Sequence, residues 1–221
     1  MPNRTTLPDN ATLHIYLRGA RGLPIVDDDE DRWAFLDAAY RANRRDPAPL
    51  EPGALFLPGA TVHPDPLVDI SAFCVLDTHY HLEIETRNGT DGSKFMQRLG
   101  SSFTTRWHGK YETTGQLFEA GYRVRPVKSE GQAQIVFAYI SVVNAAEAAG
   151  ASREWSSSDE LIAAATSYKF SSLPDYYLDR QLPLVTKKER FLEPFPNLDA
   201  LRDFVALRPN ELDSVASWTR A

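Results

Sequence analysis

The spacing of apolar residues along the chain predicts alternating strands and amphipathic helices. Strand-like patterns occupy three regions, 12–17, 68–85 and 115–127, the last of which suits a strand or a hairpin. Apolar residues recur with a helical period in 31–45, 93–108 and 131–149, and shorter helices are expected at 159–165 and 197–207. This order of elements favours an α+β fold, with one antiparallel sheet and helices packed mainly on one face.

The connection at 46–66 contains six prolines and two glycines. Such a composition predicts an extended segment, which we interpret as part of one domain rather than a boundary between two. The chain has 221 residues and 43% hydrophobic content, enough for one globular domain with a small terminal appendage.

The sequence also bears on compartment and redox state. No stretch approaches the ~18–20 consecutive apolar residues of a membrane span, and residues 1–12 lack the apolar core of a signal peptide. We therefore expect a cytoplasmic protein with no membrane partner. The single cysteine, Cys74, lies in an apolar run, which predicts a buried structural thiol rather than a nucleophile.

Charge is distributed unevenly along the chain. The net charge is −6, with five consecutive acids at 27–31, but residues 87–128 hold eight basic residues against three acidic ones. A local basic face of this kind can hold a phosphate backbone even on an acidic protein. The alternative interpretation is an ordinary solvated surface.

Two histidines stand close together in the segment DTHYHLE at 77–83. Alternate side chains of a strand share a face, so a strand here would place on one face Asp77, His79, His81 and Glu83. Two imidazoles at this spacing can both reach one divalent cation. The alternative is two half-exposed histidines on a solvated sheet face.

Tyr139 is the second candidate, on the predicted helix at 131–149. Tyrosines on helices are commonly core residues, but other side chains can supply the apolar stripe here: Ile135, Val136, Val142 and Val143. A phenol is a suitable nucleophile toward a phosphodiester, because the aryl phosphate keeps the bond energy and can leave again on reversal.

These residues and their order resemble the single-tyrosine HUH transposases, especially the REP-associated group. His79-Tyr80-His81 is similar to the His–hydrophobic–His motif. Further matching segments follow in the family's order: LHIYLRG at 13–19, DEDRWAFL at 29–36, FMQRL at 95–99, GQLFEAGY at 115–122, AYI at 138–140 with Asn144, and WSS at 155–157.

The resemblance implies an HUH, ferredoxin-like fold and a role for each matching residue. His79 and His81, with Asn144 as third ligand, would bind Mg²⁺ or Mn²⁺ against the scissile phosphate. Tyr139 would attack phosphorus, forming a 5′-phosphotyrosine link and a free 3′-hydroxyl. The substrate would be single-stranded DNA with hairpins, contacted by basic side chains. The candidates for that contact are Lys94, Arg98, Arg106, Arg123 and Arg125.

The sequence departs from the family pattern at Asn144. The family places the asparagine four residues after the tyrosine, on the same helix face, whereas here it comes five residues after Tyr139. A π-bulge would restore the alignment. Without one, Asp77 or Glu83 would have to complete the site. His14, at a family-like position, is expected to pack or hydrogen-bond rather than bind metal.

Three functions compete. The leading hypothesis is a transposase that cleaves and rejoins single-stranded DNA, with the catalytic domain at 11–160 and a helical C-terminal extension at 161–221. The alternative is a domesticated, non-cleaving DNA-binding protein of the same fold. A third is a metal-dependent phosphodiesterase that uses water as the nucleophile. The sequence permits a homodimer without requiring one.

Overall fold

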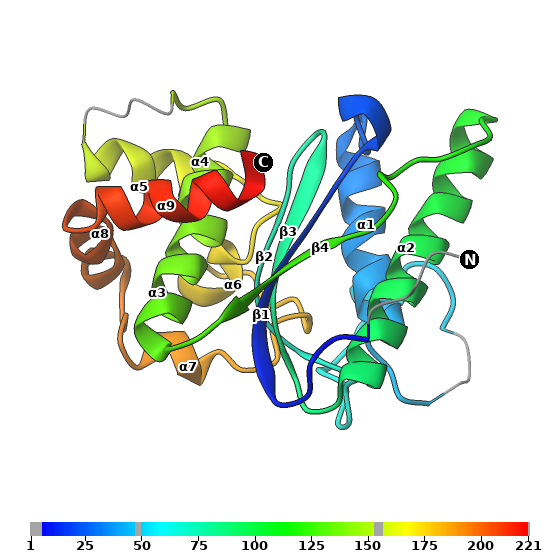
Figure 1. Ribbon diagram of the computed structural model, residues 1–221, viewed down its shortest axis with the longest axis horizontal. Helices are drawn as coiled ribbons and strands as arrows, with labels where there is room; N and C mark the ends of the chain where they lie inside the picture. The colour runs from blue at the N-terminus through cyan, green and yellow to red at the C-terminus, as the bar shows by residue number, and fades with distance from the viewer. Residues whose placement is uncertain (1–5, 47–49, 153–156, 221) are drawn as a thin grey trace.

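The protein is built on a four-stranded antiparallel sheet, shown in Figure 1. The computed structural model describes residues 6–46, 50–152 and 157–220. The strands are β1 (Ala11–Arg18), β2 (Asp69–Val75), β3 (His79–Thr86) and β4 (Arg123–Val127), and their order in the sheet is β2-β3-β1-β4. The central strand β1 therefore pairs with β3 on one side and with β4, an edge strand, on the other.

Two long helices cover one face of the sheet, α1 (Asp29–Ala42) and α2 (Gly89–Tyr111) (Figure 1). The Asp28 carboxylate accepts a hydrogen bond from the Asp31 N–H and caps α1, and the acids in the first turn suit the helix dipole. Tyr80 of β3 projects toward this layer, and its ring centroid lies 4.6 Å from that of Phe35. The apolar residues that alternate along the strands are buried between the sheet and these two helices.

The elements that follow β4 pack against the opposite face (Figure 1). The strand register puts His14, His79 and His81 on that face, which is called here the histidine face. They are α3 (Glu130–Ala138), the π-helix η3 (Tyr139–Val143), α4 (Asn144–Ala148), α5 (Ser158–Ser167), α6 (Leu173–Tyr177), α7 (Glu189–Leu192), α8 (Leu198–Ala206) and α9 (Pro209–Arg220). The α+β class and the antiparallel sheet are thus confirmed. The expectation of helices mainly on one face is wrong, because the chain after β4 supplies a second helical layer on the other face.

The single strand expected over 68–85 is wrong, because the chain turns at 76–78 and forms the hairpin β2–β3. The turn closes with a hydrogen bond from the Leu76 N–H to the His79 carbonyl, 2.8 Å long. In the region 115–127 only β4 is a strand, and Phe118 makes an isolated bridge to Gly19. A strand pattern marks extended backbone but does not mark where the chain reverses.

The connection at 46–66 is irregular where it is described, apart from the 3₁₀ turn η2 (Ala54–Phe56). The buried carboxylate of Asp37 on α1 holds it in place, accepting hydrogen bonds from the N–H groups of Gly53 and Leu55 at 2.9 and 3.0 Å. The connection therefore belongs to the α1–α2 layer.

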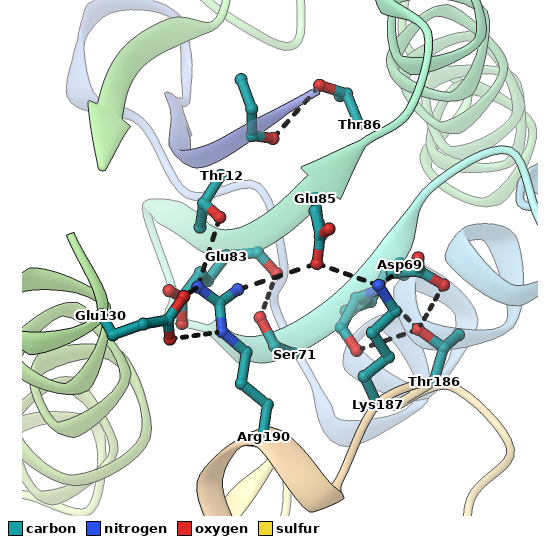
Figure 2. A network of polar contacts seen from close by, with 12 residues as sticks. Thr12, Asp69, Ser71, Glu83, Glu85, Thr86, Glu130, Thr186, Lys187 and Arg190 are labelled. Atoms are coloured by element: carbon teal, nitrogen blue, oxygen red, sulfur yellow. Dashed lines mark hydrogen bonds and ion pairs between the residues drawn. The ribbon is translucent and has the colours of Figure 1, made fainter. Parts of the chain in front are cut away.

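The C-terminal part is joined to the sheet by the polar network in Figure 2. The Arg190 guanidinium on α7 contacts Glu130 at 2.9 Å and donates to the hydroxyl of Thr12 at 3.3 Å. The Lys187 ammonium lies 3.0 Å from both Asp69 and Glu85. The predicted domain division at 160 falls inside α5.

The same part shares its apolar core with the rest of the protein. The rings of Phe191 on α7 and Phe137 on α3 stack with centroids 4.2 Å apart. Within the described ranges, no helix is both long and apolar enough to cross a membrane. Trp155 and Ser156, from the last of the family-like segments, lie outside the described residues.

Candidate active site on the histidine face

His79 and His81 lie side by side on β3, as strand alternation requires. Their rings meet edge to face, with centroids 5.0 Å apart and planes at 80°. His81 is fully buried, whereas His79, at the start of the strand, is half-buried.

In both histidines a polar side chain contacts the Nδ1 atom. The Nδ1 atom of His79 lies 3.0 Å from the Thr78 hydroxyl oxygen. The Nδ1 atom of His81 lies 2.9 Å from the Nε2 atom of His14 on the neighbouring strand. A metal-binding histidine uses one ring nitrogen for the metal and the other for a hydrogen bond. Nε2 is therefore the nitrogen that each ring would offer to a metal.

His14 is fully buried against His81, with ring centroids 5.2 Å apart. Burial lowers the pKa of His14 to about 3, and the positive charge of Arg125 lowers it further in the same direction. The expectation that His14 packs and hydrogen-bonds agrees with this position.

Tyr139 approaches the same cluster from the helical layer. Its side chain is 2% exposed, and its ring meets that of His81 edge to face with centroids 5.8 Å apart. The ring of His14 lies at 6.2 Å. The tyrosine and the second histidine, 58 positions apart in the sequence numbering, are therefore neighbours.

The helix that carries Tyr139 contains a π-turn between Tyr139 and Asn144, which is one of the two alternatives that the sequence left open. The Ser129 side chain caps α3. At Tyr139 the backbone widens from α3 into η3, where the Asn144 N–H donates to the Tyr139 carbonyl. An i to i+5 hydrogen bond brings residues five apart onto one helix face. Asn144 thus follows Tyr139 on the same side despite the extra residue.

Asn144 is 1% exposed, and its amide Nδ2 has no hydrogen-bond partner among the described residues. A buried amide nitrogen without a partner is uncommon, and because it is a hydrogen-bond donor, the group that suits this place is an acceptor oxygen.

Helix α9 closes the histidine face. The Tyr16 hydroxyl donates to the backbone carbonyl of Trp218 at 2.5 Å, and the Trp218 ring lies 6.2 Å from that of His14. Tyr16 is the cross-strand partner of His81. The candidate nucleophile and the inner histidine are consequently enclosed between the sheet and the last helix.

The two carboxylates considered as alternative ligands lie elsewhere. Asp77 is in the β2–β3 turn, 70% exposed, and pairs with Arg32 of α1 at 2.5 Å, so its placement on the histidine face is wrong. Glu83 is on that face and fully buried. Burial raises the pKa of Glu83 to about 8, against the opposing charge of Arg190.

No three His, Cys, Asp or Glu side chains gather closely enough to hold a metal ion within the described part of the chain. A metal site here would have to combine the two imidazoles with a donor of another type. The amide oxygen of Asn144 is such a donor.

The five basic candidates divide between two faces. Arg123 and Arg125 are exposed on β4, where they pair across the sheet with Tyr16 and His14 and so share the histidine face. The other three lie on α2, on the opposite side of the sheet: Lys94, Arg98 and Arg106.

The acids at 27–31 neutralise part of the basic segment. Arg106 pairs with Glu30 at 2.6 Å, and the Lys110 ammonium lies 2.7 Å from Asp28 and 2.8 Å from Asp31. These ion pairs join the start of α1 to α2. The acidic run and part of the basic segment therefore stabilise the packing of the two helices at this end of α2.

A groove of about 950 Å³ lies between α1, α2 and the proline-rich connection. Its lining includes two aromatic side chains, Trp33 and Phe56, and the arginines Arg98 and Arg106. The aromatic rings meet edge to face at 5.7 Å, and Phe56 is 49% exposed. This groove and the histidine face are separate features.

Sequence reasoning gave no site role to Tyr16, His14 or Trp218. Tyr16 and His14 could have been identified from the sequence, because alternate residues of β1 share a face in the same way as those of β3. Nothing local to Trp218 indicates that its backbone would meet Tyr16, which lies at the other end of the chain.

The fold is similar to one solved structure in particular, that of a REP-associated tyrosine transposase bound to a REP hairpin. The match has a TM-score of 0.53 and 13% sequence identity, and covers 84% of this chain and 90% of the other. No protein-family model matches the chain, and no curated protein matches its sequence. At this identity the likeness shows the fold alone.

Proposed function

We propose that this chain is a DNA transposase that cleaves and rejoins single-stranded DNA through Tyr139. The observation that carries the proposal is the π-turn, which brings Asn144 onto the same helix face as Tyr139, whose ring lies against that of His81. A five-residue spacing would otherwise separate the tyrosine from the asparagine. π-bulges occur frequently at functional sites.

In the proposed reaction the Tyr139 phenol oxygen attacks the phosphorus of a DNA phosphodiester. A bond forms between this oxygen and phosphorus, the phenolic proton departs, and the bond from phosphorus to the 3′ oxygen breaks. The 3′ oxygen takes up a proton and becomes a free hydroxyl. Rejoining reverses the step, because the phosphotyrosine keeps the energy of the broken bond.

The donor set fits a divalent cation such as Mn²⁺ or Mg²⁺. Imidazole nitrogens of His79 and His81 and the amide oxygen of Asn144 would hold it, because a mixed set of nitrogen and oxygen donors suits such a cation. When bound, the cation would stabilise the charge that develops on the phosphate oxygens.

Two surfaces are available for DNA. The solved neighbour is bound to a REP hairpin, and we propose a hairpin-containing single strand as the partner of this chain. Arg123 and Arg125 flank the histidine face, where the scissile phosphate would lie. The α1–α2 groove combines arginines with the exposed ring of Phe56 and the partly buried ring of Trp33, which suits stacked bases.

A non-cleaving DNA-binding protein is the second candidate, and the burial of Tyr139 favours it. A side chain that is 2% exposed is out of reach of a phosphodiester in this conformation. Cleavage would therefore require the helical layer to open, and we propose α9 as the element that moves, since its Trp218 lies against Tyr16 and His14. Under the second hypothesis α9 stays where it is and DNA contacts only the outer surfaces.

The deciding experiment incubates the full chain with Mn²⁺ and labelled single-stranded oligonucleotides from the DNA flanking its own gene. Denaturing gel electrophoresis then separates free DNA from covalently labelled protein. We expect a labelled protein band with the wild type and none with Tyr139→Phe or His79→Ala.

Two other results would each redirect the proposal. Hairpin binding without any labelled band, across several metals, would identify a non-cleaving DNA-binding protein. Cleavage that survives in Tyr139→Phe without a protein adduct would identify a phosphodiesterase in which water is the nucleophile.

A further inference from the structure

We infer that His14 is a positioning residue, which accepts the Nδ1 proton of His81 and thereby directs the Nε2 lone pair of His81 toward the reaction site. The inference rests on the proposed function, since it concerns the histidine that would bind the metal. Its foundation is the direct contact between the two rings, with 2.9 Å between His14 Nε2 and His81 Nδ1.

The contact is built into the register of the sheet. His81 pairs directly with Tyr16 on β1, and His14 pairs with Glu83, so the two histidines are diagonal neighbours on one face. Their planes are only 28° apart, which allows one ring nitrogen to point at the other. The pairing of β1 with β3 extends over the whole length of both strands and holds this alignment.

A hydrogen bond between two imidazoles contains a single proton. Two protons between the nitrogens would collide, and none would leave two lone pairs facing each other. The proton therefore resides either on His81 Nδ1 or on His14 Nε2. In the first arrangement a neutral His81 has its lone pair on Nε2. In the second it has a proton there and cannot bind a metal through that atom.

Neighbouring rings hold the His81 imidazole in this orientation. His81 is fully buried, and rings from three further residues surround it at centroid distances of 5.0–5.8 Å: His79, Tyr16 and Tyr139. The imidazole has no room to turn over and exchange its two nitrogens. His14 is itself fully buried, so bulk water cannot take its place as the hydrogen-bond partner.

Thr78 offers a parallel. Its hydroxyl contacts Nδ1 of His79 at 3.0 Å. In both His79 and His81, therefore, Nδ1 has a side-chain partner and Nε2 points away from that partner. A second partner that orients a metal-binding histidine commonly changes metal affinity by ~10–100-fold. We assign to His14, for His81, the role that Thr78 has for His79.

The first test reads the tautomer directly in the full-length, metal-free protein. Long-range ¹H–¹⁵N NMR of ¹⁵N-histidine-labelled wild type, with His81 assigned by substitution, distinguishes a proton on Nδ1 from one on Nε2. We expect His81 to hold its proton on Nδ1. A proton on Nε2 in the wild type would overturn the inference.

The second test compares two substitutions of His14. The amide oxygen of His14→Gln can accept the same proton, whereas His14→Leu fills the space without an acceptor. We expect the glutamine variant to keep the Nδ1 tautomer and bind Mn²⁺ within about threefold of wild type. The leucine variant should shift His81 toward the Nε2 tautomer and bind Mn²⁺ ~10–100-fold more weakly, by electron paramagnetic resonance titration.

Thermal unfolding of both variants separates positioning from folding. If His14→Leu unfolds, the wild-type tautomer and the glutamine variant still decide the question. Equal Mn²⁺ affinity in a folded leucine variant would overturn the inference. A wild type that binds no Mn²⁺ and forms no DNA adduct would contradict the proposed function, whereas the tautomer of His81 would still be read independently.

Discussion

The backbone N–H of Asn144 donates to the carbonyl oxygen of Tyr139, five residues earlier in the chain, and places the two side chains on one face of the helix. A regular α-helix would direct them ~140° apart. A local change from i+4 to i+5 hydrogen bonding thus accommodates one extra residue in this helix. The candidate nucleophile and the candidate ligand remain on the same helix face.

Asn144→Ala should weaken Mn²⁺ binding by roughly tenfold or more, because the amide oxygen is the third protein donor of the proposed site. Titration calorimetry or electron paramagnetic resonance would measure the affinity. Ser141→Ala is the matched control, since Ser141 lies in the same π-turn but contacts Ser172 at 2.8 Å. Unchanged Mn²⁺ affinity in Asn144→Ala would remove Asn144 from the site.

Tyr16→Phe should loosen α9 without changing the sheet. It removes the hydrogen bond to the Trp218 carbonyl, which contributes on the order of 1 kcal/mol. Hydrogen exchange followed by mass spectrometry should show amides of 209–218 exchanging roughly fivefold faster.

Tyr177→Phe is the control for this change. Its hydroxyl donates to the Phe195 carbonyl, also among the C-terminal helices but away from α9. If both variants leave exchange in α9 unaltered, the Tyr16 contact does not hold the helix. If Tyr16→Phe also forms DNA adducts faster, movement of α9 limits access to Tyr139.

Arg190→Met should lower the free energy of unfolding by about 1–2 kcal/mol. The guanidinium, 15% exposed, bridges Glu130 on α3 and Thr12 on β1, as Figure 2 shows. The high exposure of Glu130 keeps the expected loss below that of a fully buried pair. Urea denaturation would measure it. Lys188→Met is the control and should change stability little, because the Lys188 ammonium donates to the exposed side chain of Gln181 at 3.3 Å.

His63 should make the protein less stable in mild acid. Burial lowers the pKa of His63, with the charge of Arg44 acting in the same direction and the Tyr40 carbonyl opposing it. The unfolded chain therefore takes up the proton first. The stabilising contribution is complete above pH ~6.5 and is lost as pH falls from there toward the lower folded pKa.

His63→Phe is the test, because a phenyl ring can keep the stacking on Tyr40, now 4.3 Å between centroids, without titrating. Urea unfolding at pH 7.5 and at pH 5 should show a smaller loss of stability for the variant than for wild type. His108→Gln controls for the removal of a histidine as such. Equal losses in wild type and His63→Phe would contradict this assignment.

The sequence by itself determined the local part of the site. Strand periodicity decides that His79 and His81 share a face, and helical periodicity decides that Tyr139 lies on a helix, since both depend only on residues close in the chain. The same reasoning failed at Asp77, because periodicity does not reveal the turn that directs this side chain toward Arg32. Counting the residues between Tyr139 and Asn144 also indicated a π-bulge as one of two alternatives.

Only the tertiary structure decided which distant residues meet. The register of β1 against β3 brings His14 to His81, and the path of the C-terminal helices brings Trp218 over Tyr16. Likewise, the basic residues of α2 lie on the far side of the sheet, where acids at the start of α1 pair with them. These contacts depend on packing between segments far apart in the chain, for which the local pattern of apolar and polar positions contains no information.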